Sequence, residues 1–131
     1  MRRLRRARRH IGRRGAFLVA HGVLFAAYGY SLDTVVDQPE RLASYAVAIS
    51  VMPIQTWAYL WGVVGALVVL AGIVRRLVSV AFGLLMGLST MWTLNFALAQ
   101  WVGEAPDRTW VGALLFGSLL ASIAIVAGWR E

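Results

Sequence analysis

Few side chains in this chain of 131 residues could carry out chemistry, and the most unusual of them is His21. It lies within residues 15–32, a stretch that contains no formally charged side chain. Ionisable groups inside apolar segments of this length are functional candidates. No carboxylate lies within any long apolar stretch of the chain to act as its partner. We therefore expect a neutral imidazole, on a helix face shared with Phe25 and Tyr28, that hydrogen-bonds to a neighbouring helix.

Metal, thiol and nucleophilic chemistry find little support in the remaining residues. The second histidine, His10, cannot build a typical metal site with His21 alone. The chain has no cysteine, which excludes disulfides, thiolate chemistry and cysteine metal sites. No pair of a nucleophile and a base is evident. We expect no cofactor, no metal and no enzymatic activity.

The composition indicates that much of the chain faces lipid. Hydrophobic residues make up 60% and charged residues 15% of the sequence, whereas soluble domains are closer to one quarter charged. A helix needs roughly 20 apolar residues to cross the hydrocarbon core. Four stretches meet this length, at about 15–32, 54–74, 77–98 and 110–129. The predicted fold is an all-α integral membrane four-helix bundle over residues 15–131, preceded by a basic arm over residues 1–14.

Arginine is distributed unevenly around these four stretches. Eleven of the thirteen basic residues precede the first stretch, lie between the second and third, or follow the fourth. They are Arg2, Arg3, Arg5, Arg6, Arg8, Arg9, Arg13, Arg14, Arg75, Arg76 and Arg130. Positive charge is retained on the cytoplasmic side during insertion. The pattern predicts a multi-pass protein of the cytoplasmic membrane with both termini in the cytoplasm, and it leaves only Arg41 and Arg108 outside.

The basic arm suits contact with anionic lipid headgroups. Arg2, Arg3, Arg5, Arg6, Arg8, Arg9, Arg13 and Arg14 are its candidate lipid-binding residues. Each arginine near such a surface contributes about 1 kcal/mol. The arm fits a helix at the inner interface and a solvated tail equally well. Nucleic acid is not an expected partner, because the arm has no aromatic side chain for base stacking. The stretch GRRGAFLV has the form of a twin-arginine export signal, but three further apolar stretches favour direct insertion.

Small residues recur at helical spacing inside the predicted spans. Helices in lipid approach one another through such residues. The candidate packing positions are Gly62, Ala66, Ser79, Gly83, Gly87, Gly117 and Ala121. They suit contacts within one copy or between copies of a homo-oligomer, and packing within one copy is the simpler interpretation. Asn95, with Thr90 and Thr93, is expected to form hydrogen bonds between helices.

Aromatic residues and the first outer loop give further expectations. Amphipathic indole rings prefer headgroup depth. Trp57, Trp61, Trp101 and Trp110 are therefore assigned to the outer interface and Trp129 to the inner one, with helix packing as the alternative for Trp61. Residues 39–52 begin with a proline, which suits the first turn of a helix. They predict a short helix on the outer leaflet or over the bundle, with an irregular loop as the alternative.

Four short stretches carry a resemblance to a known group. They are HIGRRGAFL at 10–18, YGYSL at 28–32, MPIQTWAYLWG at 52–62 and the closing AGWRE. Together they resemble small four-span membrane proteins of actinobacterial phages and prophages, a largely uncharacterised group. The resemblance implies a location in a host cytoplasmic membrane. It supplies no catalytic residues.

Two functional hypotheses follow. In the first, the protein is a holin-like membrane-permeabilising protein that self-associates through Gly83 and Gly87. In the second, it is a membrane-anchored interaction protein that recruits a protein partner, not identified by the sequence, through the arginine arm or the outer helix.

Overall fold

A computed structural model describes residues 12–102 and 106–129 of the chain. Four long helices dominate it: α2 (Arg13–Asp33), α5 (Ile54–Ile73), α6 (Val78–Val102) and α7 (Thr109–Ala127). Two short helices, α3 (Pro39–Ala43) and α4 (Ala46–Val51), connect α2 to α5, and the 3₁₀ turn η1 (Arg75–Leu77) connects α5 to α6. No strand occurs among the described residues. All four long helices have the length and apolar composition needed to cross a membrane, close to the predicted boundaries.

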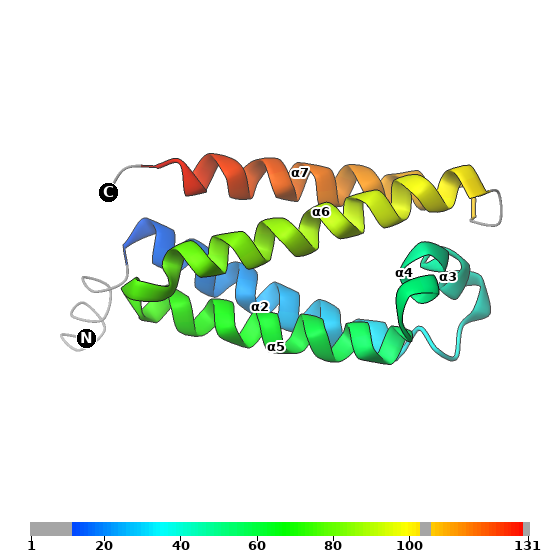
Figure 1. Cartoon of the computed structure of the whole chain (residues 1–131), viewed down its shortest axis with the longest axis horizontal. Coiled ribbons are helices and arrows are strands. Elements are labelled where there is room, and N and C mark those ends of the chain that lie inside the picture. Colours follow the sequence, from blue (N-terminus) through cyan, green and yellow to red (C-terminus); the bar gives the residue numbers. More distant parts are fainter. Residues whose placement is uncertain (1–11, 103–105, 130–131) are drawn as a thin grey trace, which may run out of the picture.

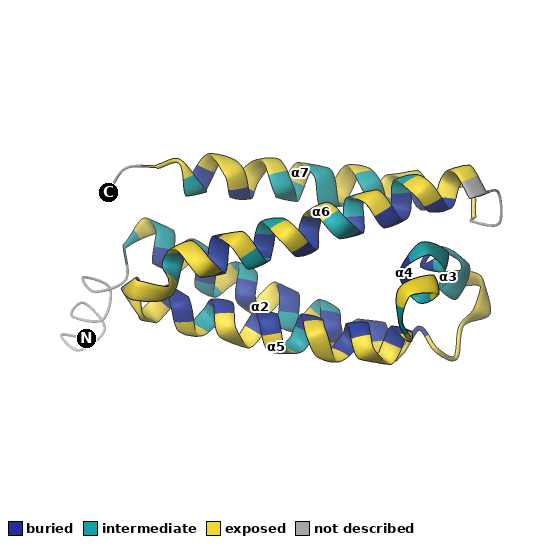
Figure 2. Cartoon of the chain, viewed as in Figure 1, coloured by how far each residue is buried: buried dark blue, intermediate teal, exposed yellow. Residues whose placement is uncertain are grey.

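The helices form two antiparallel pairs, α2 with α5 and α6 with α7 (Figure 1). Helix α6 also contacts α5 and α2, so it joins the two pairs. Helix α7 packs mainly on α6, and its only buried residues are Thr109, Ile123 and Val126. Exposed positions follow α7 along its length (Figure 2). Lipid would therefore cover more of α7 than of the other three long helices.

The contact between α2 and α5 depends on small residues that repeat every seven positions. Gly22 lies so close to α5 that a Cβ atom there would be 2.7 Å from the carbonyl oxygen of Gly65. A Cβ atom on Gly65 would in turn be 2.5 Å from the backbone nitrogen of Ala26. The same approach recurs one heptad away in each direction, at Gly29 with Ala58 and at Gly15 with Gly72. Backbone-to-backbone packing of this kind is how helices gain contact in lipid.

The two ends of the bundle differ in what they carry. We call the end that bears residues 34–53 and the α6–α7 connection the connector end, and the opposite end, where α2 begins and α7 ends, the terminal end (Figure 1). The guanidinium of Arg14 donates a hydrogen bond of 3.0 Å to the carbonyl oxygen of Ala127. This bond places the start of α2 beside the end of α7. The first and last described residues therefore lie at the same end of the bundle.

Aromatic side chains form the core near the connector end. Trp61 and Trp92 are fully buried, with ring centroids 5.2 Å apart. Trp57 is 2% exposed and lies 4.8 Å from Trp92. The interfacial assignment of Trp57 and Trp61 is therefore wrong, because both rings turn inward, and the packing alternative holds for Trp61. The other three indole rings assigned to the interfaces are exposed: Trp101, Trp110 and Trp129.

The prediction that the small residues pack against neighbouring helices of the same copy is wrong for most of them. Ala66, Ser79, Gly83, Gly87 and Ala121 are exposed. A Cβ atom on Gly83 or Gly87 would meet no atom within 4 Å. Of the remaining two positions, Gly62 and Gly117 are half-buried, and a Cβ atom on Gly117 would reach the Thr93 side chain at 3.7 Å. Ser79, Gly83 and Gly87 are on α6, which turns all three away from its neighbours.

Candidate functional site

The segment between α2 and α5 is helical in two pieces. Pro39 begins α3, as its fixed φ angle favours. The α3 helix ends at Ala43, and Ser44 and Tyr45 form the turn that precedes α4. Helix α4 ends at Val51, just before Pro53 and the start of α5. The short helix predicted over residues 39–52 is therefore split, and Figure 1 shows both pieces at the connector end.

Asn95 of α6 holds this segment against the bundle. Its Oδ1 accepts a hydrogen bond of 2.8 Å from the backbone N–H of Ala48, and its Nδ2 donates one of 3.2 Å to the carbonyl oxygen of Ser44. Asn95 is only 2% exposed, and its bond with Ala48 is buried. The predicted hydrogen-bonding role of Asn95 is confirmed, and both of its partners lie in residues 34–53, which we call the connector. Thr93 bonds to a carbonyl oxygen of its own helix, and Thr90 is exposed.

A second set of hydrogen bonds centres on the Tyr28 hydroxyl. It accepts a bond of 2.8 Å from Nε1 of Trp92 and pairs at 3.2 Å with the hydroxyl of Tyr45. Nε1 of Trp57 donates 2.9 Å to the carbonyl oxygen of Ala48. These bonds connect α2, the α3–α4 turn, α4, α5 and α6. They fix the position of the connector, because buried polar groups in an apolar setting are costly to leave unpaired.

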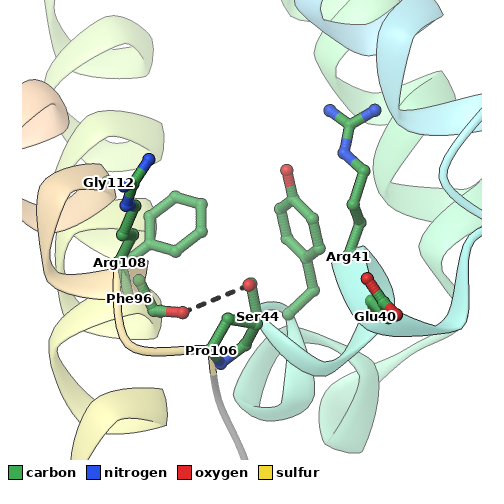
Figure 3. A pocket seen from close by; sticks show the side chains of 9 residues that line it. Glu40, Arg41, Ser44, Phe96, Pro106, Arg108 and Gly112 are labelled. Carbon is green, nitrogen blue, oxygen red and sulfur yellow. Dashed lines mark hydrogen bonds between the residues drawn. The ribbon is translucent and has the colours of Figure 1, made fainter.

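A cleft of about 370 Å³ opens between the connector segment and the start of α7. Its lining is Glu40, Arg41, Ser44, Tyr45, Phe96, Pro106, Arg108, Thr109 and Gly112. The hydroxyl groups of Ser44 and Thr109 lie 3.2 Å apart and join its two sides (Figure 3). Figure 3 shows Arg41 on one side of the cleft and Arg108 on the other. Gly112 allows the Phe96 ring to lie against the α7 backbone, since a Cβ atom there would be 2.8 Å from the ring.

The environment of His21 differs from the expected one. Its Nδ1 lies 2.9 Å from the carbonyl oxygen of Phe17, one turn earlier on α2. Its ring is half-buried and stacks on the Phe17 ring, with centroids 3.8 Å apart. The predicted bond to a neighbouring helix is thus wrong, because the ring folds back along its own helix. Among the described residues, no group of three or more His, Asp and Glu side chains could hold a metal ion with it.

The two described arginines of the basic arm have different surroundings. Arg13 is exposed, whereas Arg14 is partly buried between the ends of three helices. The Arg14 guanidinium lies 5.1 Å from the centroid of the Phe82 ring, in addition to its bond with Ala127. A cation near the last carbonyl groups of α7 is favoured by the helix dipole. Arg2, Arg3, Arg5, Arg6, Arg8 and Arg9 lie outside the described residues, so lipid binding by the arm remains a prediction.

Three features of this region were missed by the sequence predictions. The Tyr28–Trp92–Tyr45 hydrogen bonds and the cleft between Arg41 and Arg108 join residues far apart in the chain, and no local spacing indicates them. The heptad of Gly15, Gly22 and Gly29 facing Ala58, Gly65 and Gly72 was readable as small residues seven positions apart.

Comparison with protein-family models, with curated proteins and with solved structures finds no match for the chain. The structure describes an all-helical chain with four helices that suit membrane crossing. It is compatible with a small multi-pass integral membrane protein.

Proposed function

We propose that this is a non-enzymatic membrane protein that acts by lateral association with further copies of itself and, in the manner of a holin, permeabilises the membrane. The cytoplasmic location of both termini, the cytoplasmic membrane as its site and an origin in a phage or prophage belong to the same proposal. The observation that carries self-association is the exposed small-residue face of α6.

That face consists of Ser79, Gly83 and Gly87, at intervals of four residues. All three are exposed, and both glycines have open space where a side chain would be. In lipid, a helix gains little by exposing small residues, but a partner helix can approach them closely. The poorly covered α7 helix supplies further apolar surface for contacts between copies.

Induced expression in a bacterium, with a dye that reports membrane potential, tests the proposal. Abrupt loss of potential at a threshold level of protein supports permeabilisation. Normal growth and potential at high expression would overturn it and favour the role of a membrane-anchored interaction protein.

A pair of matched variants tests the association surface. Gly83→Leu with Gly87→Leu fills open space, so the single copy should fold normally while the oligomer dissociates. Ala20→Leu with Ala27→Leu adds bulk at exposed positions of α2 and serves as the control. An oligomer unchanged by the glycine variant, measured by crosslinking in membranes, would exclude this face.

A further inference from the structure

We infer that the cleft at the connector end binds the headgroup of an anionic phospholipid of the phosphatidylglycerol class, with its phosphodiester held between Arg41 and Arg108. The inference is independent of self-association, because it concerns a different surface. It begins from the charges that line the cleft.

Arg41 and Arg108 are the only basic residues in residues 34–53 and 103–109, which connect the spanning helices at this end. They come from separate elements, the last turn of α3 and the residue before α7, and both line the same cleft. Figure 3 shows the two guanidinium groups on opposite sides of it. Guanidinium groups match phosphate oxygens in shape and charge, so two of them across a cleft suit a phosphate.

Neither guanidinium is committed to a carboxylate among the residues that the structure describes. Arg41 donates a hydrogen bond of 3.1 Å to Oε1 of Gln38, which carries no charge. Both arginines are exposed. Thr109, the first residue of α7, also lines the cleft, and the N-terminus of a long helix favours negative charge. The cleft therefore has donors ready for an anion.

The remaining lining distinguishes a lipid from a free anion. Phe96, Tyr45 and Gly112 add apolar surface to the lining, which free phosphate would not use. The cleft lies where α6 ends and α7 begins, at the depth of headgroups if these helices cross the bilayer. Acyl chains can then remain in the leaflet while the phosphodiester enters the cleft.

Glu40 determines which headgroup fits. It also lines the cleft, and Figure 3 shows its carboxylate apart from both guanidinium groups. With two arginines and one glutamate, the lining has a formal charge of +1, which one phosphodiester neutralises. A glycerol headgroup offers hydroxyl donors to the Glu40 carboxylate. Phosphatidylcholine has no such donor.

Native mass spectrometry of the full chain, delipidated in detergent, tests the inference by titration with phosphatidylglycerol. The variant Arg41→Gln with Arg108→Gln should weaken binding of the first lipid at least tenfold. Arg75→Gln with Arg76→Gln removes the same charge from the turn η1, outside both the cleft and the basic arm, and should change binding less than twofold. Equal losses in the two variants would overturn the inference, because binding would then follow net charge alone.

Two further arms identify the ligand. Phosphatidylcholine should bind at least tenfold more weakly than phosphatidylglycerol, and inorganic phosphate should not compete at millimolar concentration. Equal binding of both lipids, or competition by phosphate, would contradict a phosphatidylglycerol headgroup site. If the double variant fails to fold, as judged by circular dichroism, Arg108→Gln alone replaces it with the same expected direction. Unchanged binding in that single variant would overturn the inference.

Discussion

Two neighbouring arginines illustrate how local environment separates residues of one type. Arg14 hydrogen-bonds to Ala127 and lies over the Phe82 ring, whereas Arg13 is exposed. Hydrogen bonds from charged groups contribute about 1.5–3 kcal/mol in proteins. We expect Arg14→Gln to lower the free energy of unfolding by about 1–2 kcal/mol, since part of the guanidinium remains accessible. Arg13→Gln is the matched control, and thermal unfolding in detergent compares them. Equal midpoints for the two variants would exclude this role of Arg14.

Asn95 is expected to control whether the connector stays on the bundle. Asn95→Leu keeps similar volume but leaves the N–H of Ala48 and the carbonyl of Ser44 without their partner. An unpaired buried group costs about 1–3 kcal/mol, enough to raise the open fraction of α4. Ala48→Cys, a fully buried site in a cysteine-free chain, reports opening by its rate of maleimide labelling.

The labelling rate should rise at least fivefold in Asn95→Leu, by the same energy estimate. The control is Thr90→Leu, an exposed position on the same helix. A rate that Asn95→Leu leaves unchanged would show that other contacts hold the connector.

His21 is expected to be dispensable. Its contacts are with Phe17 on its own helix, and the carbonyl that it meets belongs to the helical backbone. His21→Leu should therefore change the unfolding midpoint and the effect on membrane potential little. Loss of the potential response in a variant that folds normally would instead assign His21 a functional role.

At the scale of the helices, the small residues of α2 and α5 set the closest approach in the bundle. A Cβ atom on Gly65 would lie 2.5 Å from Ala26 N and 2.6 Å from Gly22 O, both backbone atoms that cannot rotate away. Gly65→Ala should lower the free energy of unfolding by about 1–3 kcal/mol, the usual cost of overpacking. Gly87→Ala meets no atom within 4 Å and is the control. Similar stability of the two variants would show that α2 and α5 separate without cost.

The helices themselves were largely predictable, but their rotation was not. Hydrocarbon thickness sets the length of an apolar helix, so the boundaries at 15–32 and 54–74 correspond closely to α2 and α5. Which face of α6 meets its neighbours depends on the aromatic rings around Trp92. These bulky side chains turn Gly83 and Gly87 outward. Small residues at a spacing of four identify a helix face that another helix can approach closely, but they do not identify which helix packs against it.

At the scale of the whole molecule, the candidate site depends on how the connectors fold. Arg41 lies between α2 and α5, and Arg108 lies directly before α7. Asn95 holds the segment that contains Arg41 against the bundle. Sequence patterns report periodicity within one element, so they predicted the polar role of Asn95 but not its partners. Arg13, Arg14 and Arg76 lie at the terminal end, apart from Arg41 and Arg108, and the side of the membrane that this end faces stays a prediction.

The proposed function requires that the chain cross the membrane four times with both ends on one side. Single cysteines at Gly12, Ser50 and Trp129 test it most directly, because the chain has no other cysteine. With a membrane-impermeant maleimide, Ser50→Cys should react in intact cells, whereas Gly12→Cys and Trp129→Cys should react only after permeabilisation. Labelling of Gly12→Cys and Trp129→Cys from opposite sides of the membrane would contradict the four-span account.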